Sequence, residues 1–407
     1  MKKIIISGAN FNNKGAQSML FIVVDEMRKR FPNCDIYFLS SEKLDLRDYS
    51  FNQLYFSVET SKILNRNFSS LLLLCTRYIK EFIKKIAVKK YKIHDPLYTI
   101  KQLKSCDFII DISGYQLGDK WSLDLNYLFL NVIKFSKRFS IPIYIMPQSF
   151  GPFDYRNLNI TEKNKLLNDI QHAMKYPRVV FARENSALKA LNQLGVDQVI
   201  LSPDLVLQNS GINKNNIYVK HPKTVLPKIQ LESVGIVPNA QCFKFGDHQI
   251  IMNLYQTLIN RLLLMDKKVY LIRHSGEDGA ICQEIKSIFF DNEDVIFLDI
   301  DLSCLEYDEL VKQFDLIVSS RYHGAVHALR NCTPCITLGW ADKYFELMKL
   351  FSLERFNFNI ADTVDTNKIV ESCNEILIQN DKYKKVIEKT ISGIREKSCF
   401  EIFDYYK

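Results

Sequence analysis

Short apolar runs alternate with longer amphipathic stretches along the chain. The first run, KKIIIS at residues 2–7, is followed by residues 15–31, in which apolar side chains recur with helical spacing. The same strand, loop and helix pattern returns at DIYFLS (35–40), CDFIIDIS (106–113), IPIYIMPQ (141–148) and RVVFAR (178–183). Near-continuous apolar strands separated by helices are typical of a parallel sheet covered on both faces.

A second series of strands begins after a polar, turn-rich boundary. QNSGINKNN (208–216) and two following prolines mark that boundary. The second series comprises ESVGIVP (232–238), KKVYLIRH (267–274), DVIFLD (294–299), FDLIVSS (314–320) and PCITLG (334–339). We therefore predict an α/β fold with two doubly wound, Rossmann-like domains facing a cleft. The predicted divisions are an N-terminal domain at 1–210, a linker at 211–230, a C-terminal domain at 231–375 and a helical segment at 376–407 that crosses back.

Composition favours a soluble globular protein of the cytoplasm. Of 407 residues, 47% are hydrophobic and 25% charged. The apolar runs are far shorter than the roughly 20 residues that cross a bilayer. The start, MKKIIISGAN, lacks the apolar stretch of about 7 to 15 residues that a signal peptide needs. Ten scattered cysteines indicate reduced thiols rather than a disulfide framework, and the lone pair in NCTPC is weak evidence for zinc or redox chemistry.

The positive charge is concentrated in one segment. Residues 77–104 hold nine basic and two acidic side chains, which accounts for most of the net charge of +8. Within residues 77–92, apolar and basic positions alternate with helical spacing, which predicts an amphipathic cationic helix. Either its charged face is solvated, or the helix rests on an anionic surface at the inner face of the plasma membrane. No nucleic-acid motif accompanies it, so we expect no nucleic-acid partner.

Polar residues follow the predicted strands at their carboxyl ends, where ligands of doubly wound sheets bind. These residues are Asn10, Asn12, Lys14, Asp111, Ser113, Gln148, Arg183, Asp204, Arg273, His274, Ser319, Ser320, Arg321, His323 and Lys343. Five of them are lysines or arginines. Because arginine pairs bidentately with carboxylate or phosphate, we expect the cleft between the domains to bind an anion.

The turn from LIVSS into RYHGAVHAL sharpens this expectation. Free amides at a helix start, together with Ser319 and Ser320, would seat a phosphate or carboxylate, and Arg321 and His323 would face the same ligand. His327 shares a helix face with His323, but without a third ligand we expect no metal site.

Purely structural roles compete with binding at four positions. Arg183 can instead pair with Glu184, and Arg273 can form an interdomain salt bridge. Asp111 and Asp204 can be turn or helix-cap residues.

Five segments together resemble the polysaccharide pyruvyl transferase family in order and spacing. They are NFNNKGAQSML near the start, PQSFGPF (147–153), FARENSALKAL (181–191), SPDLVL (202–207) and LIVSSRYHGAVHALRNCTPCITLGWADKY (316–344). The resemblance covers residues 5–345. It implies a fold like that of the GT-B glycosyltransferases, and transfer of the enolpyruvyl group of phosphoenolpyruvate to a sugar as a pyruvate ketal. The implied acceptors are cell-surface glycans or their lipid-linked precursors.

The resemblance also implies roles for individual residues. The family's R-x-H element contacts phosphoenolpyruvate and matches Arg321 and His323, while the arginine after the F-A-R strand matches Arg183. Many members carry Gly-Asp in the N-terminal loop where this chain has Gly15 and Ala16, so no role of that aspartate carries over.

These expectations combine into a reaction scheme without a metal or cofactor. His323 would protonate the methylene group, Arg321 and Arg183 would stabilise the departing phosphate, and Asp111 is our first choice of base. Other expected contacts to phosphoenolpyruvate are Ser319, Ser320, Arg273, His274 and Lys343. Asn10, Asn12, Lys14, Gly15 and Gln148 are expected on the acceptor or loop side.

Two other functions stay open on sequence. One is a GT-B glycosyltransferase that uses a nucleotide-sugar, and the other is a non-catalytic glycan-binding protein of the same fold. The loop after the TLGW strand offers Ala341, Asp342 and Lys343 where such a glycosyltransferase often places a glutamate, which favours a small, doubly anionic donor.

Overall fold

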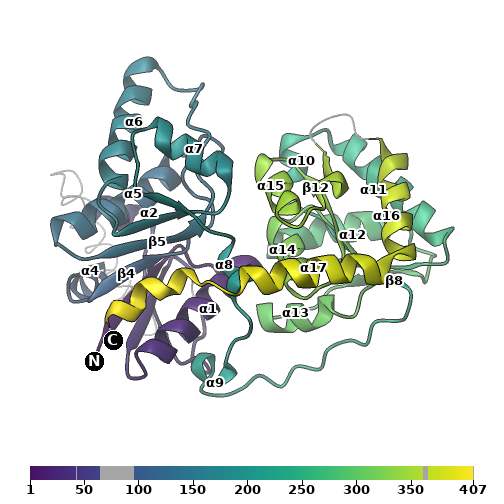
Figure 1. The fold of residues 1–407 in the computed structure, drawn as a ribbon, viewed down its shortest axis with the longest axis horizontal. Helices are drawn as coiled ribbons and strands as arrows, with labels where there is room; N and C mark the ends of the chain where they lie inside the picture. Colours follow the sequence, from purple (N-terminus) through teal and green to yellow (C-terminus); the bar gives the residue numbers. More distant parts are fainter. Residues whose placement is uncertain (43, 65–95, 361–364, 407) are drawn as a thin grey trace, which may run out of the picture.

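The chain folds into two α/β domains that lie side by side (Figure 1). The computed structural model describes residues 1–42, 44–64, 96–360 and 365–406. In each domain a parallel sheet has helices packed against it, as the uninterrupted apolar strands require.

The N-terminal sheet has the strand order β3-β2-β1-β4-β5-β6-β7, and every neighbouring pair is parallel. The strands are β1 (Lys3–Ser7), β2 (Asp35–Ser40), β3 (Asn52–Tyr55), β4 (Phe108–Asp111), β5 (Ile143–Gln148), β6 (Val179–Ala182) and β7 (Val199–Leu201). The sequence pattern predicted five of these strands. It missed β3 and β7, which form the two edges of the sheet and are short and partly exposed.

The C-terminal sheet has the order β10-β9-β8-β11-β12-β13, again with parallel neighbours. Its strands are β8 (Ser233–Val237), β9 (Lys268–Ile272), β10 (Val295–Leu298), β11 (Leu316–Ser319), β12 (Cys335–Gly339) and β13 (Asn357–Asn359). Five of them were predicted, and the edge strand β13, with the sequence NFN, was missed.

The helices connect the strands and cover the sheets. In the N-terminal half they are α1 (Lys14–Arg30), α2 (Val58–Leu64), α4 (Pro96–Lys104), α5 (Leu123–Arg138), α6 (Ile160–Met174), α7 (Asn185–Gln193), α8 (Leu205–Gln208) and α9 (Lys214–Ile217). In the C-terminal half they are α10 (Cys242–Phe245), α11 (His248–Leu263), α12 (Gly279–Ile288), α13 (Cys304–Val311), α14 (Tyr322–Arg330), α15 (Asp342–Leu350), α16 (Thr366–Ile378) and α17 (Asn380–Ile394). The described residues also form the 3-10 helices η1 (Gly276–Asp278), η2 (Glu354–Phe356) and η3 (Cys399–Tyr406).

The C-terminal segment ends against the N-terminal domain. Figure 1 shows α17 leading from the C-terminal domain toward the other domain, where both chain ends lie. There Phe403 of η3 stacks on Phe108 of β4, with ring centroids 5.5 Å apart, and Asp404 pairs with Arg30 of α1 at 3.0 Å. The 3-10 helix η3 therefore packs against the N-terminal domain through β4 and α1.

The first part of the expected linker also packs on the N-terminal domain. The backbone amide of Asn213 and the side-chain amide of Asn216 donate to Oδ1 of Asp25 on α1, at 3.3 and 2.8 Å. The extended connection between the domains therefore begins after α9.

The expected cationic helix at 77–92 lies outside the described residues. Within the described part of the chain, no helix is long and apolar enough to cross a membrane.

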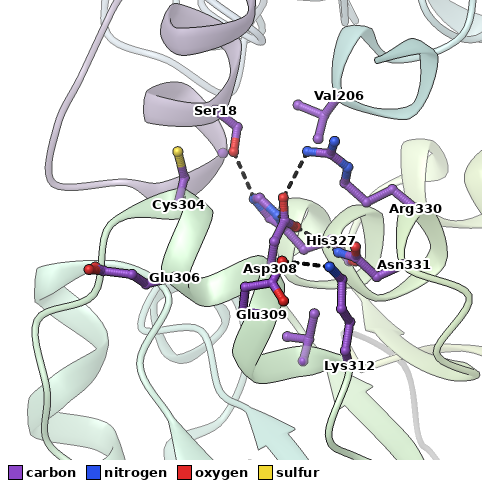
Figure 2. Close-up of polar contacts among 12 residues, drawn as sticks. Ser18, Val206, Cys304, Glu306, Asp308, Glu309, Lys312, His327, Arg330 and Asn331 are labelled. Carbon is purple, nitrogen blue, oxygen red and sulfur yellow. Dashed lines mark hydrogen bonds and ion pairs between the residues drawn. The ribbon is translucent and has the colours of Figure 1, made fainter. Parts of the chain in front are cut away.

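A buried polar cluster joins the two domains (Figure 2). His327 on α14 bonds Ser18 of α1 through Nε2 at 3.2 Å and Asp308 of α13 through Nδ1 at 2.7 Å. Arg330 donates to the other oxygen of Asp308 at 2.9 Å, and also to the backbone carbonyl of Asn209, at 3.2 Å. His327 is fully buried, and its two hydrogen bonds link α14 to α1 of the N-terminal domain and to α13.

Candidate active site

A cavity of about 420 Å³ opens between the carboxyl ends of the two sheets. Two loops that meet at its rim are bonded to each other through the backbone: Lys14 N donates to His274 O at 3.3 Å, and Gly276 N to Asn12 O at 3.3 Å. The strand-end residues of the two domains are therefore held in a fixed relation. Eight of the predicted strand-end residues line this cavity: Asn10, Asp111, Ser113, Arg183, His274, Arg321, His323 and Lys343.

Arg183, just after β6, supplies a guanidinium group from the N-terminal domain. Its Nη1 donates to Asp204 at 2.9 Å and its Nε to Ser149 at 2.9 Å, while Glu184 lies 3.3 Å away. The guanidinium lies 4.1 Å from the ring centre of Tyr322. Arg183 therefore pairs with Glu184 and also lines the cavity, as each of the two alternatives predicted.

Asp204 connects that arginine to His323 across the domain boundary. The oxygen that accepts from Arg183, Oδ2, lies 3.4 Å from Nε2 of His323. The other oxygen caps α8 by accepting from the amide of Val206 at 2.9 Å. Burial raises the pKa of Asp204, but the neighbouring His323 and Arg183 and the amide lower it further, so the carboxylate stays ionised. The sequence reading treated Asp204 only as a strand-end or capping residue and missed this pairing.

His323 is held from two sides. Burial lowers the pKa of His323 from its usual value, and the adjacent Asp204 opposes that shift. On the other side α1 approaches so closely that a Cβ added at Gly15 would lie 2.1 Å from Cγ of His323. Gly15 therefore makes room for the imidazole rather than contacting a substrate. The glycine that opens α1 was predicted as a loop residue, without this packing role.

Arg321 is bound by carboxylates of its own domain. It pairs with Asp278 through Nε at 2.9 Å and Nη2 at 2.5 Å, and with Glu277 at 2.5 Å. Both cavity arginines therefore already have acidic partners. Those partners fix the planes of the guanidinium groups, which favours oriented binding over simple charge attraction.

Lys343 at the start of α15 lies among aromatic rings. Its Nζ lies 5.0 Å from the ring centres of Tyr115 and Trp340 and 5.5 Å from that of Tyr322. Burial, followed by the charge of Arg183, lowers the pKa of Lys343 to about 7. The ammonium group is therefore easily neutralised, and an anion beside it would restore its charge.

Several predicted contacts do not line the cavity. Ser319 donates to the backbone of Arg321, and the Ser320 hydroxyl bonds Tyr255 at 2.6 Å, so neither serine is free to seat an anion as expected. Arg273 pairs with Asp299 of its own domain, not across the domains. Three further predicted residues do not line the cavity themselves and bond to other side chains: Lys14 pairs with Asp301, Asn12 bonds Glu42, and Gln148 bonds Asp111.

Asp111 lies at the cavity but is a poor base. Its two oxygens accept four hydrogen bonds, from the hydroxyls of Ser7 and Ser113, the amide of Ser113 and the side chain of Gln148. These donors occupy the lone pairs that a substrate hydroxyl would need. Asp111 therefore ties β1, β4 and β5 together, and the expectation that it acts as the base is not supported.

The N-terminal side of the cavity is aromatic and apolar. Tyr115 and Trp121 pack edge to face with ring centroids 5.6 Å apart, and Leu125, Leu128 and Phe129 of α5 continue the wall. Flat rings beside polar groups suit a sugar, whose faces are apolar and whose rim carries hydroxyls. No cluster of three or more potential metal ligands occurs among the described residues.

Three solved structures with a similar fold were determined with a nucleotide or a nucleotide-sugar. The chain is similar to the S. aureus MnaA protein solved with UDP, with 12% identity, TM-score 0.58, and 95% of this chain and 91% of that chain covered. It is similar to UDP-GlcNAc 2-epimerase from Neisseria meningitidis bound to UDP-GlcNAc, with 12% identity, TM-score 0.54 and full coverage of both chains. Spinosyn rhamnosyltransferase SpnG, solved with thymidine diphosphate, has 9% identity, TM-score 0.54, and 100% and 99% coverage. At these identities the likeness establishes the GT-B-like fold alone.

Comparison at the level of sequence gives the family. None of the curated proteins compared with the chain matches it significantly. The sequence model of the polysaccharide pyruvyl transferases, however, matches residues 13–342. This range contains every strand of both sheets except β1 and β13. It also contains every residue named at the cavity except Asn10 and Lys343. The chain belongs to the polysaccharide pyruvyl transferase family.

Proposed function

We propose that the protein transfers the enolpyruvyl group of phosphoenolpyruvate to a sugar of a cell-surface polysaccharide or its lipid-linked precursor. The product is a pyruvate ketal, and phosphate is released. The observation that carries the proposal is the convergence of Arg183, Arg321, His323 and Lys343 on one interdomain cavity. Family membership and an aromatic wall suited to a sugar support it.

The donor's chemistry fits this set of side chains. Phosphoenolpyruvate carries a carboxylate and a phosphate on a three-carbon skeleton. Arg183 and Arg321 enter the cavity from opposite domains, so they suit a ligand with an anionic group at each end. Lys343 lies between the aromatic rings at the same cavity, and an anion beside it would favour its charged form.

In the proposed reaction His323 donates a proton to the methylene carbon of the donor, which makes C2 electrophilic. One sugar hydroxyl attacks C2, phosphate leaves with the C2–O electron pair, and the second hydroxyl closes the ketal. Arg183 and Arg321 stabilise the negative charge that develops on the phosphate. The scheme uses phosphoenolpyruvate as a co-substrate and requires no cofactor.

Ligand-induced stabilisation separates this proposal from a nucleotide-sugar enzyme. A ligand that binds only the folded protein raises the free energy of unfolding, and the increase grows with the logarithm of the ratio of ligand concentration to Kd. We expect phosphoenolpyruvate to raise the melting temperature, and UDP-GlcNAc and thymidine diphosphate to leave it unchanged. Stabilisation by the nucleotides alone would contradict the proposed donor.

We also propose that residues 77–92 attach the protein to the inner face of the plasma membrane. The support is the cationic, amphipathic pattern of the sequence. Reversing the charges of Lys80, Lys84 and Lys85 should reduce sedimentation with vesicles containing phosphatidylglycerol. Unchanged sedimentation would leave a solvated surface segment as the explanation.

A further inference from the structure

His274 is a buried histidine at the cavity whose ring makes no hydrogen bond to any described residue. It follows β9, its side chain is 1% exposed, and both ring nitrogens lack partners. Its ring instead packs edge-on against Tyr307, with ring centroids 5.2 Å apart, and at a tilt against His327, with ring centroids 5.7 Å apart. Leaving a buried polar atom unpaired costs about 1–3 kcal/mol. A side chain kept in that condition beside a cavity points to a partner that arrives with the substrate.

The backbone around His274 keeps the ring in place. The carbonyl of His274 accepts from Lys14 N of the other domain, and the next residue, Ser275, forms a β-bridge with Asn13. The amide of Ser275 also donates to Asp278 at 2.9 Å. The ring is therefore positioned without using either of its nitrogens.

The charges around His274 keep it neutral. The groups that face it are Arg321, His323 and His327 on and before α14, Lys14 on α1 and the phenol of Tyr307 on α13. Burial, and then the charges of His327, Arg321, His323 and Lys14, lower the pKa of His274 well below its usual value. His323 differs, because Asp204 lies 3.4 Å from it. A bound anionic donor favours the protonated form of both histidines. Because Asp204 also stabilises the charged form of His323, we expect His323 to be protonated before His274.

The reaction requires a base, and the occupied oxygens of Asp111 do not provide one. We propose that His274 is the base that removes the proton from the first attacking sugar hydroxyl, while His323 is the acid. This assignment rests on the proposed pyruvyl transfer. The two histidines of the cavity then have different roles because only His323 has a carboxylate beside it: His323 is the acid and His274 is the base.

The proton transfers balance over one turnover. His323 gives its proton to the methylene carbon, which becomes the methyl group. His274 accepts the proton of the first hydroxyl as its oxygen bonds to C2, and passes that proton to the departing phosphate as the C2–O bond to phosphate breaks. The second hydroxyl loses its proton to His323 as the ring of the ketal closes. Both histidines are thereby returned to their starting states.

Substitution of His274 tests the assignment in a phosphate-release assay with phosphoenolpyruvate and an accepting 4-nitrophenyl glycoside. His274→Asn and His274→Gln keep a polar side chain without a basic ring nitrogen. We expect kcat to fall roughly 10²- to 10⁴-fold, with the Kd for phosphoenolpyruvate changed less than about threefold. His248→Asn, at an exposed histidine paired with Glu284, is the control and should match the wild type. Added imidazole should restore part of the activity of His274→Ala, which a purely structural histidine would not show.

Each outcome separates the assignment from the proposed function. A wild type that releases no phosphate with any acceptor refutes pyruvyl transfer itself. An active wild type with kcat kept in the folded His274 variants, or with only the Kd raised, overturns the base assignment alone. Should the variants unfold, ¹⁵N-histidine spectra of the wild type still decide. On addition of phosphoenolpyruvate we expect one cavity histidine to become protonated and the other to stay neutral, and protonation of both would contradict the assignment.

Discussion

Oδ2 of Asp204, in the N-terminal domain, lies 3.4 Å from Nε2 of His323 in the C-terminal domain. The same oxygen accepts a hydrogen bond from Arg183. One carboxylate atom thus couples the orientation of the candidate acid to an arginine of the opposite domain. Because Nε2 is the ring nitrogen that lies next to Asp204, Nδ1 is the one left to exchange a proton with a ligand.

Replacing Asp204 with Asn should remove the charge that helps His323 hold its proton. We expect kcat to fall roughly 10²-fold or more. Because loss of the carboxylate lowers the pKa of His323, the limb in which activity declines with rising pH should move to lower pH. Asp308→Asn is the matched control, since that carboxylate pairs with His327 and Arg330 away from the cavity. It should lower the melting temperature without moving the pH profile, and an unmoved profile in Asp204→Asn would show that the carboxylate is only structural.

His323 and Arg321 should separate chemistry from binding. His323→Ala removes the proton donor, so we expect turnover to fall about 10²- to 10⁴-fold while phosphoenolpyruvate affinity changes little. Arg321→Lys loses the planar fork, and with it charge-assisted hydrogen bonds of about 1.5–3 kcal/mol each, so affinity should fall about tenfold or more. Titration calorimetry and steady-state kinetics on both variants give the comparison. Wild-type turnover in His323→Ala would remove that residue from the mechanism.

Gly15 should not tolerate a side chain. A Cβ there would overlap the His323 ring, with the nearest atoms 2.1 and 2.3 Å away, so Gly15→Ala must displace either α1 or the imidazole. We expect kcat to fall with a modest drop in melting temperature. Gly211→Ala is the control, because a Cβ added there meets nothing within 4 Å. Equal activity of the two variants would show that the close approach has no functional weight.

Lys343 should make donor binding depend on pH. Its pKa of about 7 in the free protein means that the fraction carrying a positive charge falls as pH rises through 7. Phosphoenolpyruvate should therefore bind more weakly at pH 8 than at pH 6.5, and binding at pH 8 should take up protons. Calorimetry in two buffers of different ionisation enthalpy measures that uptake. It should be reduced in Lys343→Met, and the same uptake in that variant would assign the titration to another group.

The sequence predicted the sheets better at their centres than at their edges. Central strands such as β1 and β11 are buried on both faces and appear as unbroken apolar runs. The edge strands β3, β7 and β13 are only three or four residues long and partly exposed, so they lack the longer apolar runs that mark the central strands. Whether a strand appears as an apolar run depends on whether it lies at the centre or the edge of the sheet, and the sequence alone does not give that position.

The sequence predicted which residues lie at the site, but not which of them contact one another. Arg183, Arg321, His323 and Lys343 were found because the carboxyl ends of parallel strands meet at one edge. The carboxylate of Asp204 belongs to a different segment from each of its partners, so the contact with His323 depends on how the domains pack. Gly15 was placed in a loop role for the same reason. Serines 319 and 320 were expected at an anion seat because their spacing resembles one, but the hydroxyl of each is used inside the fold.

The most direct test of the central claim is mass spectrometry of a panel of glycosides incubated with the wild-type protein and phosphoenolpyruvate. We predict that one glycoside gains the mass of one pyruvate less one water, with an equal amount of phosphate released, and that His323→Ala abolishes both. A panel left unmodified with phosphoenolpyruvate, together with transfer of a sugar from UDP-GlcNAc, would contradict the account.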